Sequence, residues 1–488
     1  MFGNVLMLTR LMLIASLLYT VNTFASDWQA LHALLPKGTQ LSYQVIDANK
    51  NNVIAQHQQE TLRTPASMQK LLTATASMLY LGKDFRYQTL LTGALSNIKN
   101  NRYKGDLRLH FVGDPTLKRQ HLIEMLLTLK KLGIRNIEGD FILNDSQFNG
   151  YQWSNGQAWN DLGVCYTSPA NAIIVNNNCV LGNLSLKSPQ AEKATLYIPA
   201  YEPVDISSNV DVVTKSQREA LFCDLEVTRN SQNNYHLWGC MVPRKRPFGL
   251  AFSVNDPFQY ASKIITQELK NLGMTLTGVV RLESQKFDLK NDDVLARYQS
   301  PKLDELLTKM MKESDNLIAD SLFKTLGAAY FQGPGNFRNG AEAVKLILKK
   351  HGIDLENAYL GDGSGLSRHN LMSAELFMSV VKFIYQNDKK LGLLSSFSVA
   401  GIDGTLKYHK GVRGKQFKGK VIAKTGSMKG VANLLGVVNT EYGDRLFVLI
   451  LNGYNQPESN LQSQLARDEN ASQYLFENAF FETILNLK

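Results

Sequence analysis

The pattern that most constrains the fold lies near the C-terminus, where apolar strand-like runs are joined by very short turns. Residues 431–440 (VANLLGVVNT) and 445–454 (RLFVLILNGY) are separated only by EYGD, and GKVIAKTGSM at 419–428 precedes them closely. Strands joined by so few residues pair in the antiparallel direction, because a parallel crossover needs a dozen or more. The sequence therefore predicts an antiparallel sheet in this part of the chain.

The N-terminal part adds a second hairpin and a helix. Residues 41–47 (LSYQVID) and 53–58 (VIAQHQ) flank the turn-forming stretch ANKNN. A helix is predicted between Pro65, which suits a helix start, and Gly82, which suits a helix end. Residues 471–488 (ASQYLFENAFFETILNLK) carry apolar side chains at helical spacing, which predicts a last helix packed on the core.

The middle of the chain follows a different plan. Residues 121–145 and 261–284 each read as an amphipathic helix, then a glycine (Gly133 or Gly273) where a left-handed cap is needed, then a strand. A weaker copy of this helix–glycine–strand pattern surrounds Gly352. At 488 residues the chain is also long for one domain. We therefore expect an α/β insertion that divides one outer domain into two sequence segments.

The first 25 residues predict a cleaved signal peptide. They hold one charge, Arg10, followed by the apolar run LMLIASLLY and by small residues at Thr23 and Ala25, so the mature chain is expected to begin near Ser26. An uncleaved N-terminal anchor is the alternative. The formal net charge of +10 falls by one when this segment is removed. The basic residues are scattered and not interleaved with aromatic side chains, which argues against nucleic acid as a partner.

Four cysteines remain in the mature chain: Cys165, Cys179, Cys223 and Cys240. An exported protein can form disulfides, and four cysteines allow three pairings. We favour the two local pairs, Cys165 with Cys179 and Cys223 with Cys240. The chain has no CxxC pair, HExxH motif or His-rich tract, so no metal site is predicted.

The helix start within TPASMQK places a serine and a lysine together. Ser67 and Lys70 are three residues apart, so their side chains are neighbours on a helix. A serine hydroxyl becomes a useful nucleophile when a base removes its proton, and a lysine can serve when burial or nearby cations lower its pKa. Two other SxxK matches, at Ser96 and Ser379, do not lie at a helix start. We therefore predict Ser67 as a nucleophile and Lys70 as its base.

Two further motifs carry groups suited to the same chemistry. TKMMKESDNLIADSL offers the hydroxyl of Ser314 and the amide of Asn316, which can relay a proton and hold an amide. VIAKTGSMKG contains the only K-[ST]-G sequence in the chain. Lys424 ends an apolar strand, Thr425 adds a hydroxyl, and Gly426 allows a substrate to lie against the backbone. A lysine at the end of a strand is, however, more often simply exposed to solvent.

In the order SxxK, SxN, KTG, the three motifs resemble the active-site signature of the serine penicillin-recognising enzymes. Ser67 and Ser314 are 247 residues apart, and Ser314 and Lys424 are 110 apart. This long first gap resembles the low-molecular-mass class C penicillin-binding proteins, a family of D-alanyl-D-alanine carboxypeptidase/endopeptidases. The resemblance extends over most of the mature chain through VGDPTL, WNDLGVCYTSPANAIIVNNN, DGSGLSRHN and AGIDGTL. Cys165 beside Tyr166 is a mild departure from the family pattern.

The resemblance implies a mixed α/β (α+β) fold. A β-lactamase/transpeptidase-like domain, with an antiparallel sheet flanked by helices, would be interrupted by a large two-part α/β insertion. The expected boundaries are residues 26–85 and 298–488 for the catalytic domain, 86–115 and 185–297 for insertion domain II, and 116–184 for insertion domain III.

The family resemblance also implies a mechanism without a metal or an organic cofactor. Ser67 would attack the carbonyl between two terminal D-alanines with Lys70 as base, and Ser314 would pass the proton to the leaving amine. Repulsion between the two lysines would lower the pKa of Lys70. Backbone N–H groups of Ser67 and Ser427 would hold the oxyanion. The substrate-binding residues would be Asn316, Lys424, Thr425, Gly426 and Ser427.

The implied partners are peptidoglycan stem peptides and β-lactam antibiotics in the periplasm. Loose association with the membrane or the wall and self-association into a homo-oligomer are further expectations. A β-lactamase and a catalytically inert cell-wall-binding protein of the same fold are the alternatives. The SDN motif and the bulky insertion argue against the first, and the intact motifs argue against the second. DGSGLSR misses the GxGxxG spacing of a phosphate-binding loop and is interpreted as a tight turn beside the site.

Overall fold

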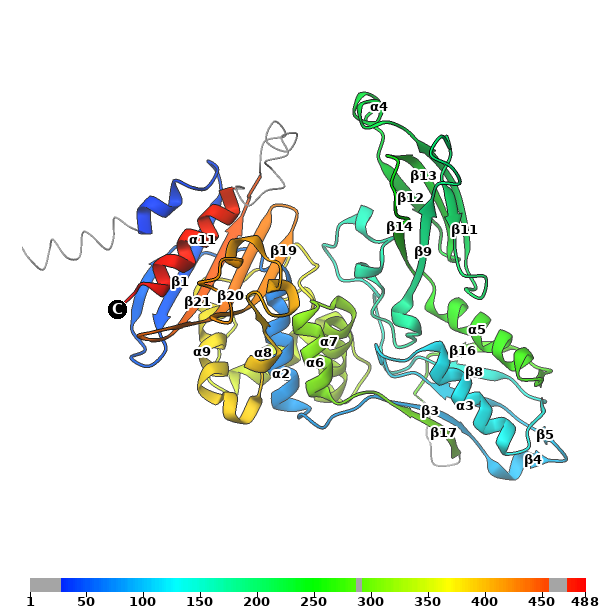
Figure 1. The fold of residues 1–488 in the computed structure, drawn as a ribbon. Coiled ribbons are helices and arrows are strands. Elements are labelled where there is room, and N and C mark those ends of the chain that lie inside the picture. The colour runs from blue at the N-terminus through cyan, green and yellow to red at the C-terminus, as the bar shows by residue number, and fades with distance from the viewer. Residues whose placement is uncertain (1–27, 287–291, 456–471) are drawn as a thin grey trace, which may run out of the picture.

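The structure is a computed structural model that describes residues 28–286, 292–455 and 472–488 (Figure 1). The predicted signal peptide lies outside the described residues. The outer domain and the insertion lie side by side. Helices α6 (Leu303–Lys312) and α7 (Asn316–Phe331) are on the side of the outer domain that faces the insertion (Figure 1). In the part of the chain described, no helix combines the length and the apolar character needed to cross a bilayer.

A six-stranded antiparallel sheet forms the centre of the outer domain. Its strand order is β18-β19-β20-β21-β1-β2, so the two predicted hairpins join through the pairing of β1 with β21. The strands are β1 (Gln40–Asp47), β2 (Val53–His57), β18 (Ser398–Val399), β19 (Val421–Met428), β20 (Val431–Thr440) and β21 (Gly443–Asn452). The prediction of an antiparallel sheet flanked by helices is confirmed.

Alternation along β21 separates two apolar cores. Leu446, Val448 and Ile450 enter the core made with most of the helices, whereas Phe447, Leu449 and Leu451 enter the core on the other face. The helices of the first core are α2 (Lys70–Tyr80), α6 (Leu303–Lys312), α7 (Asn316–Phe331), α8 (Phe337–Lys349) and α9 (Ala374–Leu391). The second face is covered by α11 (Ser472–Leu485) through Phe476, Phe480 and Phe481. The predicted last helix therefore packs on the core.

The lower part of the insertion is a five-stranded mixed sheet with two helices on it. The strand order is β16-β8-β6-β3-β17, and α3 (Arg119–Lys131) and α5 (Pro257–Asn271) pack on it. The strands are β3 (Gln88–Gly93), β6 (Leu107–His110), β8 (Phe141–Asn144), β16 (Val280–Glu283) and β17 (Asp293–Gln299). Gly133 and Gly273 follow the two helices with φ values of 86° and 68°, so both serve as the left-handed caps predicted from the sequence.

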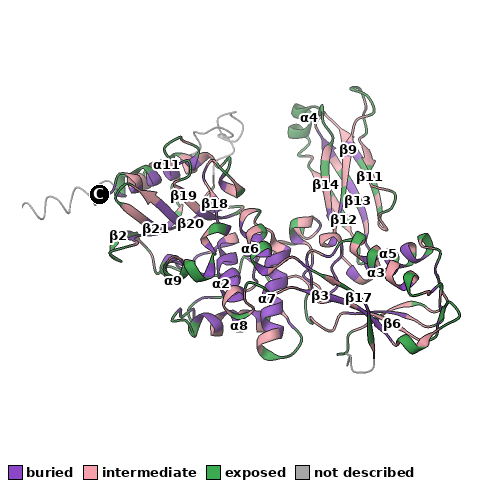
Figure 2. Ribbon diagram, turned by 60° about the horizontal axis from the view of Figure 1, so that its bottom comes forward, coloured by how far each residue is buried: buried purple, intermediate pink, exposed green. Residues whose placement is uncertain are grey.

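A projecting lobe forms the rest of the insertion, and Figure 2 shows that its strands are less buried than the helices α2 and α7. Two three-stranded sheets, β10-β9-β14 and β11-β13-β12, enclose a small core that includes Leu184, Val210 and Leu237. The strands are β9 (Cys179–Ser185), β10 (Thr195–Tyr197), β11 (Asp205–Val212), β12 (Leu225–Arg229), β13 (Asn234–Met241) and β14 (Phe248–Ser253). A helix, α4 (Lys215–Ala220), lies at the tip of the lobe.

The insertion also contains a small sheet outside the lobe. It is formed by four short strands, β4 (Ile98–Lys99), β5 (Arg102–Tyr103), β7 (Asn136–Ile137) and β15 (Thr275–Leu276).

Strand pairing divides the insertion differently from the boundaries predicted within it. The segment 116–184 was expected to be a domain of its own, but its strand β8 lies between β6 and β16 of the neighbouring segments. Its helix α3 packs in the core of that same sheet. The pairing of β8 with β6, 34 residues earlier, and with β16, 139 residues later, decides this division, and no local sequence pattern indicates it. The outer boundaries, 26–85 and 298–488, stay a prediction.

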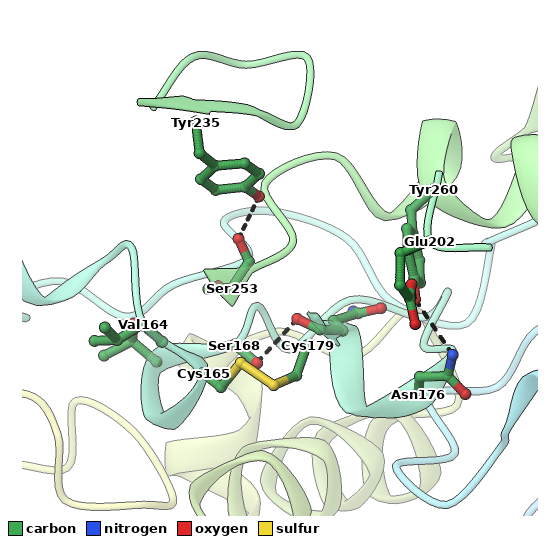
Figure 3. The surroundings of a disulfide bond; sticks show 11 residues. Val164, Cys165, Ser168, Asn176, Cys179, Glu202, Tyr235, Ser253 and Tyr260 are labelled. Atoms are coloured by element: carbon green, nitrogen blue, oxygen red, sulfur yellow. Dashed lines mark hydrogen bonds between the residues drawn. A yellow bond between two sulfur atoms is a disulfide. The ribbon is translucent and has the colours of Figure 1, made fainter. Parts of the chain in front are cut away.

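Two disulfides connect the four cysteines in the favoured pairing. Cys165 bonds to Cys179 and Cys223 to Cys240, with Cα–Cα distances of 5.3 Å and 5.5 Å. Figure 3 shows the first bridge between the 3-10 turn η4 (Cys165–Thr167) and the start of β9. The second bridge connects the segment after α4 to β13 in the projecting lobe. The prediction of two local bridges is confirmed.

Reduction of the protein is expected to loosen the projecting lobe before the outer domain. The Cys223–Cys240 bridge closes a loop of 17 residues, and a bridge of that size contributes about 3 kcal/mol to stability. Hydrogen exchange with and without reductant measures the effect, with β12 and β13 losing protection first. The amides of β20 and β21 serve as the internal control. Equal loss of protection in both regions would contradict the prediction.

Candidate active site

The predicted nucleophile lies at the junction of a strained turn and a helix. Ser67 is half-buried in the 3-10 turn η1 (Ala66–Gln69), which runs directly into α2. Ala66, just before it, has a φ of 47°, in the left-handed region that residues with a Cβ rarely adopt. Such strain persists where the surrounding structure enforces it, and it concentrates at functional sites. The turn therefore holds the serine in a fixed position at the mouth of the helix.

Lys70 lies against Ser67, as the three-residue spacing predicts. Its Nζ donates to Ser67 Oγ at 2.8 Å, to Asn316 Oδ1 at 2.6 Å and to the backbone oxygen of Ser364 at 2.6 Å. The side chain is fully buried. Three acceptors hold the amino group in one place beside the hydroxyl.

Burial is the main cause that perturbs the pKa of this base. Loss of solvent lowers the pKa of Lys70 to about 8, while the carboxylates of Asp320, Asp362 and Asp315 act in the opposite direction. The direction predicted from the sequence holds, and burial is its main cause. For Lys424, burial first and the charge of Lys70 second lower the pKa well below its ordinary value.

Lys424 is not the solvent-exposed lysine that a strand end usually carries. It lies on β19 with no exposed surface, and its Nζ donates to Ser314 Oγ at 3.0 Å and to the backbone oxygen of Thr425 at 2.9 Å. Ser314 occupies the turn between α6 and α7 with a φ of 59°, a second left-handed residue in the site. The structure therefore brings the SxxK, SxN and KTG motifs together at one place.

The remaining residues of the KTG strand lie beside Lys424. Thr425 donates its hydroxyl to Thr405 Oγ1 at 3.0 Å, and Ser427 is exposed. A Cβ on Gly426 would lie 2.5 Å from the backbone oxygen of Pro65. The glycine is therefore required by the close packing of β19 on the turn that carries Ser67, in addition to any approach by a substrate.

The sequence is similar to those of known proteins. Residues 28–474 match the D-Ala-D-Ala carboxypeptidase 3 (S13) family. The chain belongs to this family. It is 38% identical over 456 residues to D-alanyl-D-alanine carboxypeptidase DacB of Haemophilus influenzae, covering 93% of each protein. It is 28% identical over 404 residues to a D-alanyl-D-alanine carboxypeptidase of Actinomadura sp., covering 80% of this chain and 74% of that protein.

Solved structures agree with the sequence matches. The crystal structure of penicillin binding protein 4 (dacB) from H. influenzae has a TM-score of 0.87 and 38% identity, over 94% of this chain and 99% of that one. A structure of that protein complexed with a novel β-lactam has a TM-score of 0.83 and 36% identity, over the same shares of the two chains. The predicted family and the predicted class of enzyme, a serine-type carboxypeptidase, are confirmed.

Sequence reasoning missed several groups that contact the motif residues of this carboxypeptidase. Lys70 donates to the backbone of Ser364, Asn316 Nδ2 donates to the backbone oxygen of Tyr166 at 2.8 Å, and Thr425 donates to Thr405. The stretch AGIDGTL, which contains Thr405, was noted only for family resemblance, and DGSG, which contains Ser364, was interpreted as a tight turn beside the site without any contact to Lys70. A backbone carbonyl leaves no signature in a sequence, because every residue has one. The contact at Tyr166 also shows that the insertion forms part of the site.

Proposed function

We propose that this chain is a serine D-alanyl-D-alanine carboxypeptidase and DD-endopeptidase that trims or opens peptidoglycan peptides through an acyl-enzyme. The observation that carries the proposal is the buried Lys70 amino group 2.8 Å from Ser67 Oγ. A lysine with a pKa near 8 has an accessible free-base form near neutral pH and can take the serine proton.

Acylation would begin with attack of Ser67 Oγ on the carbonyl carbon of the D-Ala-D-Ala bond while Lys70 Nζ takes the hydroxyl proton. The backbone N–H groups of Ser67 and Ser427 would hold the resulting oxyanion. As the C–N bond breaks, Ser314 would give its hydroxyl proton to the leaving amine and would recover a proton from the Lys70 ammonium, which returns Lys70 to its free-base form. Because Lys424 donates to Ser314 Oγ, the hydroxyl hydrogen of Ser314 is left free for this transfer. Water would then release the acyl group and restore Ser67.

Substrate binding would use the KTG strand and Asn316. Lys424 and Thr425 would bind the terminal carboxylate of the stem peptide. Asn316 accepts from Lys70 with Oδ1 and donates one Nδ2 hydrogen to Tyr166, so its second amide hydrogen is left for the substrate. Asn316 would therefore position the base and the peptide together.

The cellular setting is part of the proposal. The curated relative from H. influenzae is a D-alanyl-D-alanine carboxypeptidase, and penicillin binding protein 4 of that organism was crystallised with a β-lactam. These matches support peptidoglycan stem peptides and β-lactams as the ligands of this chain. The predicted signal peptide and the two disulfides favour the periplasm. The basic net charge supports loose association with the wall or with an anionic membrane surface. Self-association of this chain into a homo-oligomer is also part of the proposal.

Incubation of the mature protein with penicillin, followed over time by mass spectrometry, tests the function. We expect a long-lived adduct on the peptide that contains Ser67. Rapid turnover of the antibiotic would indicate a β-lactamase, and the absence of any adduct would indicate an inert wall-binding protein. Purified muropeptides with pentapeptide tails or with cross-links then separate carboxypeptidase from endopeptidase activity. Absence of both activities would contradict the proposed reaction.

A further inference from the structure

Helix α7 carries three polar side chains four residues apart. Asn316, Asp320 and Lys324 therefore share one face of the helix. The proposed mechanism uses only Asn316. Asp320 is 4% exposed and Lys324 is 1% exposed. Burying an ionisable side chain is unfavourable unless its partners compensate, so each of these two residues needs a structural or chemical reason.

Lys324 has an evident structural reason. Its Nζ donates to the backbone oxygens of Tyr151 and Ala170 at 2.8 Å and 2.6 Å. It therefore ties α7 to the segment of the insertion that also supplies the Tyr166 carbonyl. Among the described residues of the insertion none makes such a contact with Asp320, whose partners lie on the side of the active site.

Asp320 holds the turn that supplies one of the acceptors of Lys70. Its Oδ1 accepts the Gly363 N–H at 3.0 Å, and its carboxyl group hydrogen-bonds to the Ser364 side chain. The backbone oxygen of that same serine accepts from Lys70 Nζ at 2.6 Å. A path of hydrogen bonds thus leads from Ser67 through Lys70 and Ser364 to Asp320.

The turn is closely packed on both sides. A Cβ on Gly363 would lie 2.6 Å from Phe323 Cβ of α7, and a Cβ on Gly365 would lie 1.9 Å from the backbone oxygen of Ala66. The DGSG stretch, interpreted from sequence as a tight turn beside the site, is therefore wedged between α7 and the turn that carries the nucleophile. Its position leaves Asp320 little freedom to move away from Lys70.

The charged groups that interact with this pair come from α2, α7, β19 and the turn at residues 362–365. Asp320 faces Lys70 of α2, Asp362 of the turn and Lys324 of its own helix. Lys70 also faces Asp315, and it faces Lys424 of β19. The buried residues of α6 and α8, which also pack on α7, are all apolar.

Burial affects the two partners in opposite directions. It raises the pKa of Asp320 to about 8, with Asp362 adding to the rise and Lys70 opposing it, and it lowers the pKa of Lys70 to about 8. The two groups therefore compete for a proton in the same pH range, and their titrations are linked.

We propose that Asp320 is a positioning residue that sets the basicity of Lys70, both by holding the turn at residues 362–365 and by placing a negative charge opposite the ammonium. The inference rests on the proposed role of Lys70 as the base. When Ser67 gives its proton to Lys70, the new ammonium lies in a site without solvent, and the carboxylate stabilises it. Without that charge Lys70 is a weaker base, so acylation is slower even when the lysine is fully deprotonated.

The test is the pH dependence of acylation by penicillin in the full mature protein carrying Asp320→Asn. The asparagine keeps an oxygen for the Gly363 N–H and removes the charge. Loss of an opposite charge lowers the pKa of a lysine, so the acid limb of the rate profile should move to lower pH by about 1–3 units, and the plateau rate should fall. An acid limb at the wild-type position would overturn the proposal.

Two further variants complete the experiment. Ser321→Ala is the matched control, because Ser321 is the buried neighbour of Asp320 and its Oγ has no hydrogen-bond partner among the described residues. We expect the wild-type profile for it. If Asp320→Asn does not fold, Ser364→Ala removes the hydroxyl bonded to the carboxyl group and should move the acid limb in the same direction, and an unmoved limb then counts against the proposal. Failure of the wild type to form an adduct on Ser67 would instead refute the proposed function itself.

Discussion

Ser67→Ala is expected to abolish the penicillin adduct and to reduce turnover of D-alanyl-D-alanine substrates on the order of 10⁴-fold or more, as loss of a catalytic nucleophile does. Folding should be unchanged. The Ser67 hydroxyl is only one of three acceptors around Lys70, and Asn316 and Ser364 continue to hold the amino group in the variant. Intact-mass spectrometry and muropeptide assays measure the two effects.

Lys70→Met is the companion variant for this prediction. The methionine fills much of the buried space of the lysine stem but cannot accept a proton, so the nucleophile remains and its base is lost. We expect acylation to slow by about 10²–10⁴-fold. Thermal unfolding of both variants separates lost chemistry from lost structure. Retained peptidase activity in well-folded Ser67→Ala would remove Ser67 from the mechanism.

Lys424→Ala is expected to lower kcat/KM for substrates with a free terminal carboxylate by about tenfold or more. A charge-assisted hydrogen bond contributes about 1.5–3 kcal/mol. The side chain is fully buried and in contact with Ser314, so the substitution also changes the surroundings of that hydroxyl. A comparison of substrates is therefore needed to assign the loss to the carboxylate.

The comparison uses a peptide whose terminal carboxylate is amidated. The amide should be a poor substrate for the wild type and far less sensitive to Lys424→Ala, since the partner charge is already missing. Lys418→Ala, which removes an exposed lysine just before the same strand, controls for net charge and should leave both substrates unaffected. Equal fold losses on the acid and the amide would show that Lys424 acts only through Ser314, Lys70 or the fold.

Local features of the fold were accessible from the sequence because short-range geometry determines them. The turn EYGD is too short for anything but an antiparallel hairpin, and β20 and β21 pair in that way. Gly82, Gly133 and Gly273 end their helices with positive φ values. The cysteines pair locally, within 14 and 17 residues.

Long-range features were accessible only through resemblance or not at all. No pattern in residues 116–184 reveals that β8 pairs with β6 on one side and β16 on the other. The sequence likewise gives no sign that Ala66 and Ser314 adopt left-handed backbone conformations. Asp320 had a weak signal, since it follows Asn316 by one helical turn in SDNLIADSL, but that spacing alone cannot show which way the helix face points.

By itself the sequence determined the neighbours within each motif: Ser67 beside Lys70, Ser314 near Asn316, and the order Lys424, Thr425, Gly426 along one strand. Helical and strand periodicities place such residues together whatever the rest of the chain does. Only the tertiary structure decided that Lys70 and Asn316, 246 residues apart, lie 2.6 Å from each other and that Lys70 and Lys424 are both buried. Burial of charge depends on all the segments that exclude water from a site, and it is this exclusion that turns an ordinary lysine into a base with a pKa of about 8.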